Sequence, residues 1–212
     1  GFKFLQHRFL KEDLNNVAFP ELLKTKKKKW NNKIDIKNKV ILVHFEQGFG
    51  DSIMFVRFVK QLKNMCGKVS LVVQDGLIKL FEDSNIGVDI YRETDLNKIH
   101  YDYVIPMMDL PIVCETNADK IPCAEGYLKV PQAIVKEYGK KYINNNNKFK
   151  IGIAYEGTLA SKETDRDISL QYLYPLMQME NVEVYSFQVD DLTRQMDRVP
   201  PGYEFIRLGG TF

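Results

Sequence analysis

Short apolar runs alternate with segments of helical periodicity along the middle of the chain. Residues 39–45, KVILVHF, form an unbroken apolar run, which is typical of a strand buried on both faces of a sheet. Residues 51–65 then repeat apolar side chains at the period of an amphipathic helix. Further predicted strands span 69–74, 88–92 and 101–107, and short predicted helices span 75–83 and 110–114. This alternation predicts a parallel α/β sheet with helices on both faces.

The pattern stops and then restarts in the second half of the chain. Residues 136–148 are polar and contain four consecutive asparagines that cannot build a core, so this stretch is predicted to be a linker or loop. A strand and turn at 149–157, a helix at 169–179 and strands at 182–188 and 203–210 follow. Because a doubly wound sheet usually has about five or six strands, we expect an incomplete second Rossmann-like domain.

The N-terminal part has a different character. Residues 3–14 are predicted to be helical, and the lysine run at 26–29 has two interpretations, a solvated connector or a patch for nucleic acid or membrane. The connector is favoured because no second basic cluster supports the patch. The predicted parts are an N-terminal helical and linker segment at 1–33, a first Rossmann-like domain at 34–143 and the start of a second one at 148–212.

Composition narrows the class of protein. The 212 residues are 44% hydrophobic with a formal net charge of +2, so a normal core is expected and a global basic field for nucleic acid is not. No segment has the ~20 apolar residues of a membrane span, and the charged start is not a signal peptide. The three cysteines are widely spaced, which favours reduced thiols in a cytoplasmic protein. The three histidines are scattered, so no metal site is expected.

The turn after the first strand has the strongest chemical signal. It contains Glu46, Gln47, Gly48, Gly50 and Asp51, at the strand end where parallel sheets bind ligands. The glycines let a backbone turn tightly or approach a ligand closely. The dinucleotide fingerprint fails because Ile53 stands where its third glycine is needed, and neither GxxxxGK[ST] nor GxSxG occurs. The turn is therefore interpreted as an acid-bearing site rather than a phosphate loop.

Two interpretations of Asp51 stay open at this point. Aspartate is a preferred helix N-cap residue, which would stabilise the helix by about 1 kcal/mol without any catalytic role. Alternatively, Asp51 is a general base that accepts a proton from an acceptor hydroxyl as that oxygen attacks.

The stretch VILVHFEQGFGDSIMFVRFVKQL resembles a known family, the glycosyltransferase-like domain that follows tetratricopeptide repeats in many bacterial proteins. That family typically reads EQGxGDxxxFxRY after a strand, and here Phe58 stands at the usual tyrosine. More distantly, the turn is similar to that of heptosyltransferases of glycosyltransferase family 9 and O-GlcNAc-transferase-like enzymes. The matching residues are Glu46, Gln47, Gly48, Gly50, Asp51, Phe55 and Arg57.

Later segments are also similar to the family. IPCAEGYLKVP at 121–131 resembles its "ip...pYl" segment, and VYSFQ at 184–188 resembles "f.sLQ". IGIAYEGTLASKETDRDISL is similar to "iGlvWaGnp....d..Rsipl", with Tyr155 in place of the common tryptophan, Gly157 at its glycine and Arg166 at its arginine.

The resemblance implies a GT-B architecture, in which an acceptor-side domain and a nucleotide-sugar-binding domain face each other. It implies inverting glycosyl transfer with Asp51 as base, and with Glu46, Gln47, Gly48, Gly50, Tyr155 and Gly157 lining the substrate cleft. No metal is obligatory and no cofactor is implied beyond the nucleotide-sugar donor. Arg166, and less strongly Lys162, would stabilise the departing diphosphate. For Arg166 an ordinary loop charge paired with Asp165 or Asp167 stays an alternative.

One departure from the family leads to a second hypothesis. The family's later donor segment, "DTavaHLAGAlG", does not occur before the sequence ends at GGTF, so we expect this chain alone to bind nucleotide-sugar poorly and to be inactive. The rival is a non-catalytic binding module with a degenerate GT-B fold, linked to tetratricopeptide repeats. The expected partners are a nucleotide-sugar and a glycan, lipid or protein acceptor, without nucleic acid or a membrane span. A homo-oligomer is left open.

Overall fold

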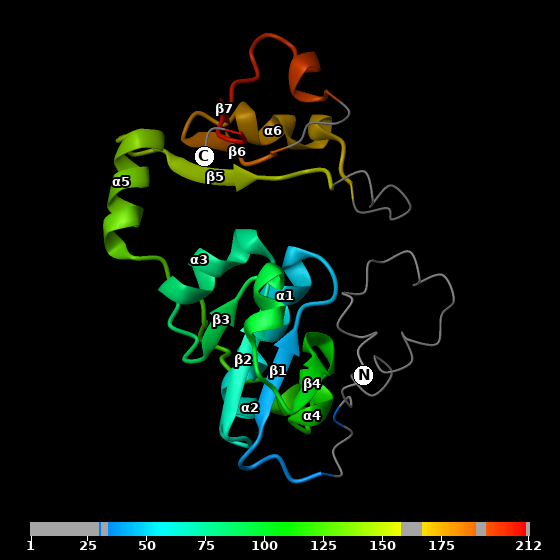
Figure 1. The fold of residues 1–212 in the computed structure, drawn as a ribbon. Helices are drawn as coiled ribbons and strands as arrows, with labels where there is room; N and C mark the ends of the chain where they lie inside the picture. Colours follow the sequence, from blue (N-terminus) through cyan, green and yellow to red (C-terminus); the bar gives the residue numbers. More distant parts are fainter. Residues whose placement is uncertain (1–29, 31–33, 158–166, 190–193, 211–212) are drawn as a thin grey trace. The chain divides into compact units, whose positions relative to one another are not determined.

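The computed structural model describes residues 30, 34–157, 167–189 and 194–210 (Figure 1). They belong to two compact units, and the boundary in the sequence falls between Gln132 and Ala133. Each unit has a parallel β-sheet with helices, so the predicted α/β class with Rossmann-like sheets is confirmed. Of the segment predicted at 1–33, only Trp30 is among the described residues. The predicted helix at 3–14 and the lysine run at 26–29 therefore lie outside them.

The first unit has a four-stranded sheet of order β3-β2-β1-β4. Its strands are β1 Val40–His44, β2 Lys68–Val72, β3 Asp89–Tyr91 and β4 Tyr103–Pro106. Its α-helices are α1 Phe49–Phe55, α2 Val59–Lys63, α3 Asp75–Asp83 and α4 Leu110–Val113, and its 3-10 helices are η4 Val56–Phe58, η5 Glu93–Lys98, η6 Met107–Asp109 and η7 Ala118–Lys120. The strand order reverses between β1 and β4, and such a switch point is where open parallel sheets bind ligands.

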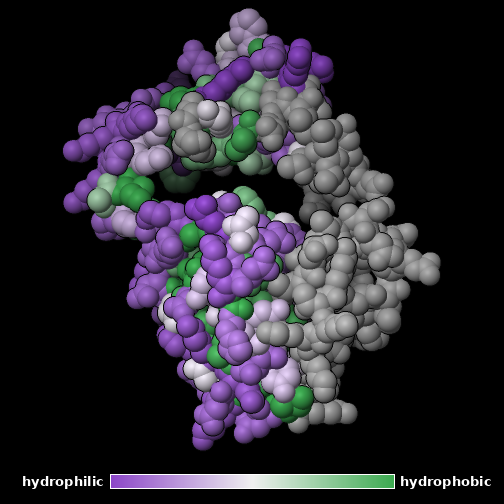
Figure 2. Space-filling view, in the orientation of Figure 1, coloured by the Kyte–Doolittle hydropathy of each residue, from purple (hydrophilic) through white to green (hydrophobic). Residues whose placement is uncertain are grey.

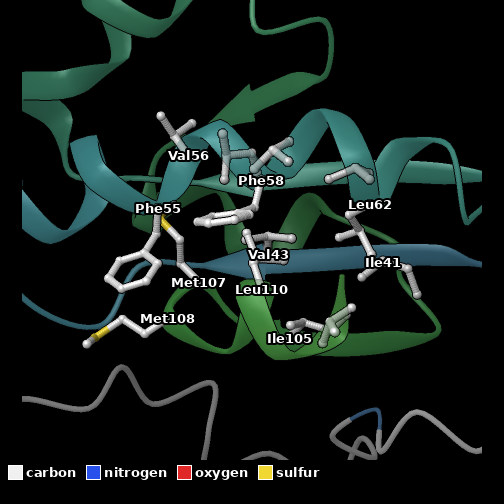
Figure 3. Packing of buried hydrophobic residues seen from close by; sticks show 14 of the residues in the cluster. Ile41, Val43, Phe55, Val56, Phe58, Leu62, Ile105, Met107, Met108 and Leu110 are labelled. Atoms are coloured by element: carbon white, nitrogen blue, oxygen red, sulfur yellow. The ribbon is translucent and has the colours of Figure 1, made fainter. Parts of the chain in front are cut away.

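Both faces of this sheet are covered, as the unbroken apolar run predicts. Ile41 and Val43 of β1 face the α-helices, and Figure 3 shows Phe58 and Leu62 pointing onto them. Leu42 faces the opposite side, in a smaller cluster built from the neighbouring strands and from the segment around η5. Burial of these side chains, at about 1.5–3 kcal/mol each, is the main stabilising contribution to the unit.

The predicted helix at 51–65 is present, but it begins at Phe49 and is divided by η4. The division falls in the stretch FVRFV at 55–59, where β-branched and aromatic side chains lose rotamer freedom in an α-helix. The remaining predicted strands and short helices of the first unit are confirmed, with α3 spanning the predicted residues 75–83.

The second unit has a parallel sheet of order β5-β6-β7. Its strands are β5 Phe149–Ile153, β6 Val182–Ser186 and β7 Ile206–Arg207, and its described helices are α5 Gln132–Tyr142, η9 Leu170–Leu173, α6 Tyr174–Met177 and η10 Met196–Arg198. One face of the sheet packs on η9, α6 and the segment 196–205 around Ile153, Leu170 and Val184.

The linker predicted at 136–148 is wrong in its first half, because helix α5 spans Gln132–Tyr142. The helix has no buried residue and contains Gly139, so its sequence lacks a strong apolar periodicity that would predict a helix. What supports it locally is the spacing of Tyr138 and Tyr142, whose rings lie 5.5 Å apart on one helix face. The asparagine run that follows is a loop, as predicted, and the backbone N–H of Asn144 donates to the Tyr185 hydroxyl at 3.0 Å.

The visible face of the first unit is mostly hydrophilic, with scattered hydrophobic side chains (Figure 2). In the part of the chain that the structure describes, every helix is too short or too polar to cross a bilayer.

Candidate functional site

The turn after β1 lies at the switch point of the first sheet, and Glu46 ties it to the neighbouring strand end. Glu46 is only 5% exposed, and its Oε2 accepts the backbone N–H of Met108 at 3.0 Å. Met108 follows β4, so the carboxylate joins the two strand ends on either side of the switch point. Glu46 therefore has a structural partner in a backbone amide.

Arg57 holds Tyr127, in the last segment of the unit. Its guanidinium lies 4.4 Å from the ring centroid of Tyr127, and its Nη2 donates to the Tyr127 hydroxyl at 3.0 Å. That hydroxyl donates in turn to the Ile53 carbonyl at 2.7 Å. Arg57 therefore fixes Tyr127 against helix α1.

Gln74, two residues past β2, holds the turn from its other side. Its Nε2 donates to the Gln47 carbonyl at 2.7 Å, and its Oε1 accepts from the hydroxyl of Ser52 at 2.8 Å. These two bonds hold Gln47 and Ser52, the residues at the two ends of the segment that contains Asp51. Neither Gln74 nor Ser52 is predicted from the sequence as part of this site.

The N-cap interpretation of Asp51 is wrong. Helix α1 begins at Phe49 with Gly48 as its N-cap, and the N–H of Ser52 donates to the Gly48 carbonyl at 3.3 Å. Asp51 is the third helical residue, half-buried, and a Cβ at Gly48 would lie 3.9 Å from its Oδ2. A carboxylate in the first turn gains about 0.3–1 kcal/mol from the helix dipole without acting as a cap.

The glycines of the turn leave space rather than permit an unusual backbone. Gly48 has a φ of −68°, and a Cβ at Gly50 would meet nothing within 4 Å. Phe49 between them is 52% exposed, and its ring lies on Gly76 of α3, where an added Cβ would be 2.9 Å from the ring. The predicted tight turn is thus not the reason for glycine at 48 and 50, whereas an open surface beside Asp51 is consistent with it.

His44, the last residue of β1, is a buried neutral base directly before the turn. Its Nδ1 donates to the Phe45 carbonyl, so Nε2 is the unprotonated nitrogen, and it has no hydrogen-bond partner among the described residues. Burial lowers the pKa of His44 to about 4, against the smaller raising effect of the bond to Phe45. His44 therefore stays uncharged at neutral pH.

The second unit has a loop after β5 that is held by Gln188. Gln188 is 6% exposed, its Oε1 accepts the N–H groups of Tyr155 and Glu156 at 3.0 and 3.1 Å, and its Nε2 donates to the Glu156 carbonyl at 2.9 Å. Tyr155 is 2% exposed and its side chain packs in the core of the unit, so only its backbone is at the strand edge. Gln195 adds a contact to the Glu156 carboxylate at 3.3 Å.

Two bonds join the ends of the loop that follows. The N–H of Gly157 donates to Asp167 Oδ1 at 2.8 Å, and the N–H of Ile168 donates to the Tyr155 carbonyl at 2.9 Å. Lys162 and Arg166, the predicted diphosphate-binding residues, lie between these ends and outside the described residues.

Other chemistry is sparse in the described ranges. They hold no group of three or more His, Cys, Asp or Glu side chains that could bind a metal ion. The three cysteines are free, and burial raises the pKa of the Cys114 thiol to about 12. A cavity of about 1050 Å³ in the second unit is lined by residues of α6, β6, η10, β7 and the segment that joins η10 to β7. Neither Gln188 nor the backbone from Tyr155 to Gly157 is among its lining residues.

Two parallel sheets with helices and with polar loops at their carboxyl edges define an α/β protein with Rossmann-like sheets. One solved structure with this fold is a glycosyl transferase family 9 protein from Veillonella parvula DSM 2008, which is similar to this chain with a TM-score of 0.59 and 11% identity. The match covers 84% of this chain and 72% of that one, and at this identity it shows the fold alone. No protein-family model and no curated protein matches the sequence.

Proposed function

We propose that this chain belongs to a glycosyltransferase that moves a sugar from a nucleotide-sugar to an acceptor hydroxyl, with inversion and without an obligatory metal. The observation that carries the proposal is the position of Asp51, half-buried in the first turn of α1 at the switch point of the sheet. The fold shared with a glycosyl transferase family 9 protein supports the reaction class.

In this proposal Asp51 accepts the proton of the acceptor hydroxyl while the acceptor oxygen forms a bond to the anomeric carbon. The bond from that carbon to the nucleoside diphosphate breaks at the same time, and the diphosphate leaves with the bonding electron pair. Glu46 has a positioning role here, because its carboxylate is buried on the Met108 amide. Gln47, Gly48 and Gly50 would border the acceptor.

The second unit would bind the donor. Arg166 and Lys162 are proposed to stabilise the departing diphosphate, and the backbone from Tyr155 to Gly157 to line the nucleotide-sugar. The proposal also assigns the acceptor side to the first predicted domain and the donor side to the second. It further includes a glycan, lipid or protein acceptor, linkage to tetratricopeptide repeats, and a bacterial cytoplasmic location.

The test uses the protein expressed from its complete reading frame. Calorimetry with UDP, GDP and ADP should detect binding of at least one of them. Asp51→Asn should abolish transfer from the matching nucleotide-sugar while lowering the free energy of unfolding by no more than the ~1 kcal/mol that a first-turn carboxylate contributes. Asp75→Asn is the matched control, because Asp75 is in the first turn of α3 at the adjacent strand end. Absence of binding for all three nucleotides would sink the proposal.

The second candidate is a binding module with a degenerate transferase fold. The departures from the family at Phe58 and Tyr155 favour it, and both side chains are buried. The reading frame separates the two candidates. A DT…H donor segment after residue 212 favours the enzyme, whereas its absence together with repeats before residue 1 favours the module.

A further inference from the structure

The two units contain the same glutamine bridge, formed by Gln74 in the first unit and Gln188 in the second. In each sheet the first and second strands have five residues and pair end to end, with His44 opposite Val72 and Ile153 opposite Ser186. Each glutamine stands two residues after the second strand. Each one donates from Nε2 to the carbonyl of the residue three positions after the first strand, Gln47 at 2.7 Å and Glu156 at 2.9 Å.

Both ends of each amide are used. Oε1 of Gln74 accepts from the Ser52 hydroxyl, and Oε1 of Gln188 accepts from two backbone N–H groups. An amide with its N–H and C=O both bonded to fixed partners has one orientation. Each side chain thus adds one more rung of hydrogen bonds beyond the last rung of the strand pair.

We infer that Gln74 and Gln188 are paired positioning residues, each of which preorganises the ligand-binding loop of its own unit. Gln74 sets the turn that contains Asp51, and Gln188 sets the backbone from Tyr155 to Gly157. The inference about ligands rests on the proposed function. Neither glutamine touches the reacting atoms, so each acts through the loop that it holds.

A preorganised loop loses little conformational freedom when it binds, so loss of the bridge weakens the step that the loop serves. The two bridges serve different steps. Replacement of Gln74 should lower kcat and leave nucleotide affinity unchanged. Replacement of Gln188 should weaken nucleotide affinity and leave kcat at saturating donor nearly unchanged. A merely structural role would change both parameters in the same way for either residue.

The test compares Gln74→Glu with Gln188→Glu in the complete protein. Glutamate keeps the oxygen that accepts, but when ionised it has no proton to donate to the loop carbonyl. Near pH 8, Gln188→Glu should weaken UDP, GDP or ADP binding about tenfold, and Gln74→Glu should lower kcat about tenfold. The control is Gln178→Glu, the same change at an exposed residue of the second unit.

Measurements at a series of pH values test whether protonation rescues the two glutamate variants. Protonation restores a donor to each glutamate, so both defects, measured relative to wild type at the same pH, should shrink as the pH falls toward about 5. A defect that is constant with pH, or identical defects in both variants, would overturn the inference.

Hydrogen exchange tests the bridge independently of nucleotide binding. In Gln188→Met, which removes the accepting oxygen at nearly the same side-chain size, the amides of Tyr155 and Glu156 should exchange about tenfold faster relative to wild type, while the amide of Ile151 in β5 stays unchanged. If wild type binds no nucleotide but these amides respond, the proposed function fails and the bridge stands. Unchanged exchange of both amides would refute the bridge itself.

Discussion

The two sheets pair their first two strands in the same register but are buried to different extents. In β1 the last four residues are buried, whereas in β5 only Ile153 is buried and Phe149 is 71% exposed. The loops after both strands are nevertheless held by the same kind of glutamine bridge. The comparison shows that hydrogen bonds at the strand ends fix the loops, while the helices that cover a sheet set how much each strand contributes to stability.

The largest expected effect is a cavity in the better-covered sheet. Leu42→Ala in β1 should lower the free energy of unfolding by about 2–5 kcal/mol, because Leu42 is 0% exposed. Ile151→Ala in β5 should cost less than half as much, because Ile151 is only partly buried. Denaturant unfolding followed by circular dichroism, with emission of Trp30 as a probe of the first unit, measures both. Equal losses would contradict the difference in burial.

Acid should destabilise the first unit through His44. The folded-state pKa of His44 is about 4, below the unfolded value of about 6.5, so the unfolded chain binds the proton more readily. The stability from neutral His44 is fully present above about pH 6.5 and falls by about 3 kcal/mol as the pH drops to about 4. Unfolding measured across this range should show the slope.

Two variants test the source of that slope. His44→Phe should flatten it, and the exposed His100→Gln should leave it unchanged. The second unit contains no histidine, so its unfolding should lack this contribution. A slope that survives in His44→Phe would assign the acid sensitivity to other groups.

A backbone contact in the second unit predicts the next effect. A Cβ at Gly209 would lie 1.7 Å from the Gln188 carbonyl oxygen, which cannot move without disturbing the strand end. Gly209→Ala should therefore destabilise the second unit by about 1–3 kcal/mol and speed amide exchange at Tyr155. Gly139→Ala, at an open helical site of the same unit, is the control and should not destabilise it. An unchanged melting temperature in Gly209→Ala would show that the chain around Gly209 relaxes.

The smallest effect has the opposite sign. Gly50 lies in the first turn of α1 with open space around it, so Gly50→Ala should raise stability by up to about 1 kcal/mol. If a ligand approaches this backbone, the same methyl group should lower glycosyl transfer. Thermal unfolding and an activity assay on one variant separate the two effects. Destabilisation would mean that the turn needs glycine for its own geometry.

The sequence predicted the sheets well and the site only in part. Strands such as β1 and β6 and the helix α3 are encoded by local periodicity and by turn residues at their ends. Helix α5 was missed because its polar, exposed residues give little hydrophobic signal. The cap at Asp51 was misassigned because the helix begins two residues earlier, at Phe49, and its N-cap is Gly48, which makes no side-chain cap bond.

The glutamine bridges were missed for a different physical reason. They join residues 27 and 32 positions apart through one side chain and one carbonyl, and no local pattern specifies such a contact. The available signal was a glutamine two residues past the second strand of each unit, in VVQ and SFQ, which becomes visible only when the two halves are aligned by their strands. The roles of Arg166 and Lys162 stay predictions, since both lie outside the described residues.

The glutamine bridge also has a consequence for how such a protein changes over generations. Backbone rungs of a sheet survive nearly every substitution, because any residue except proline supplies the same N–H and C=O groups. The rung made by Gln74 or Gln188 depends on one codon. A single base change there can loosen one loop while the sheet beneath it keeps its strand pairing. Substitutions at these two codons would therefore be a short evolutionary route between a protein with an ordered binding loop and one whose loop no longer binds.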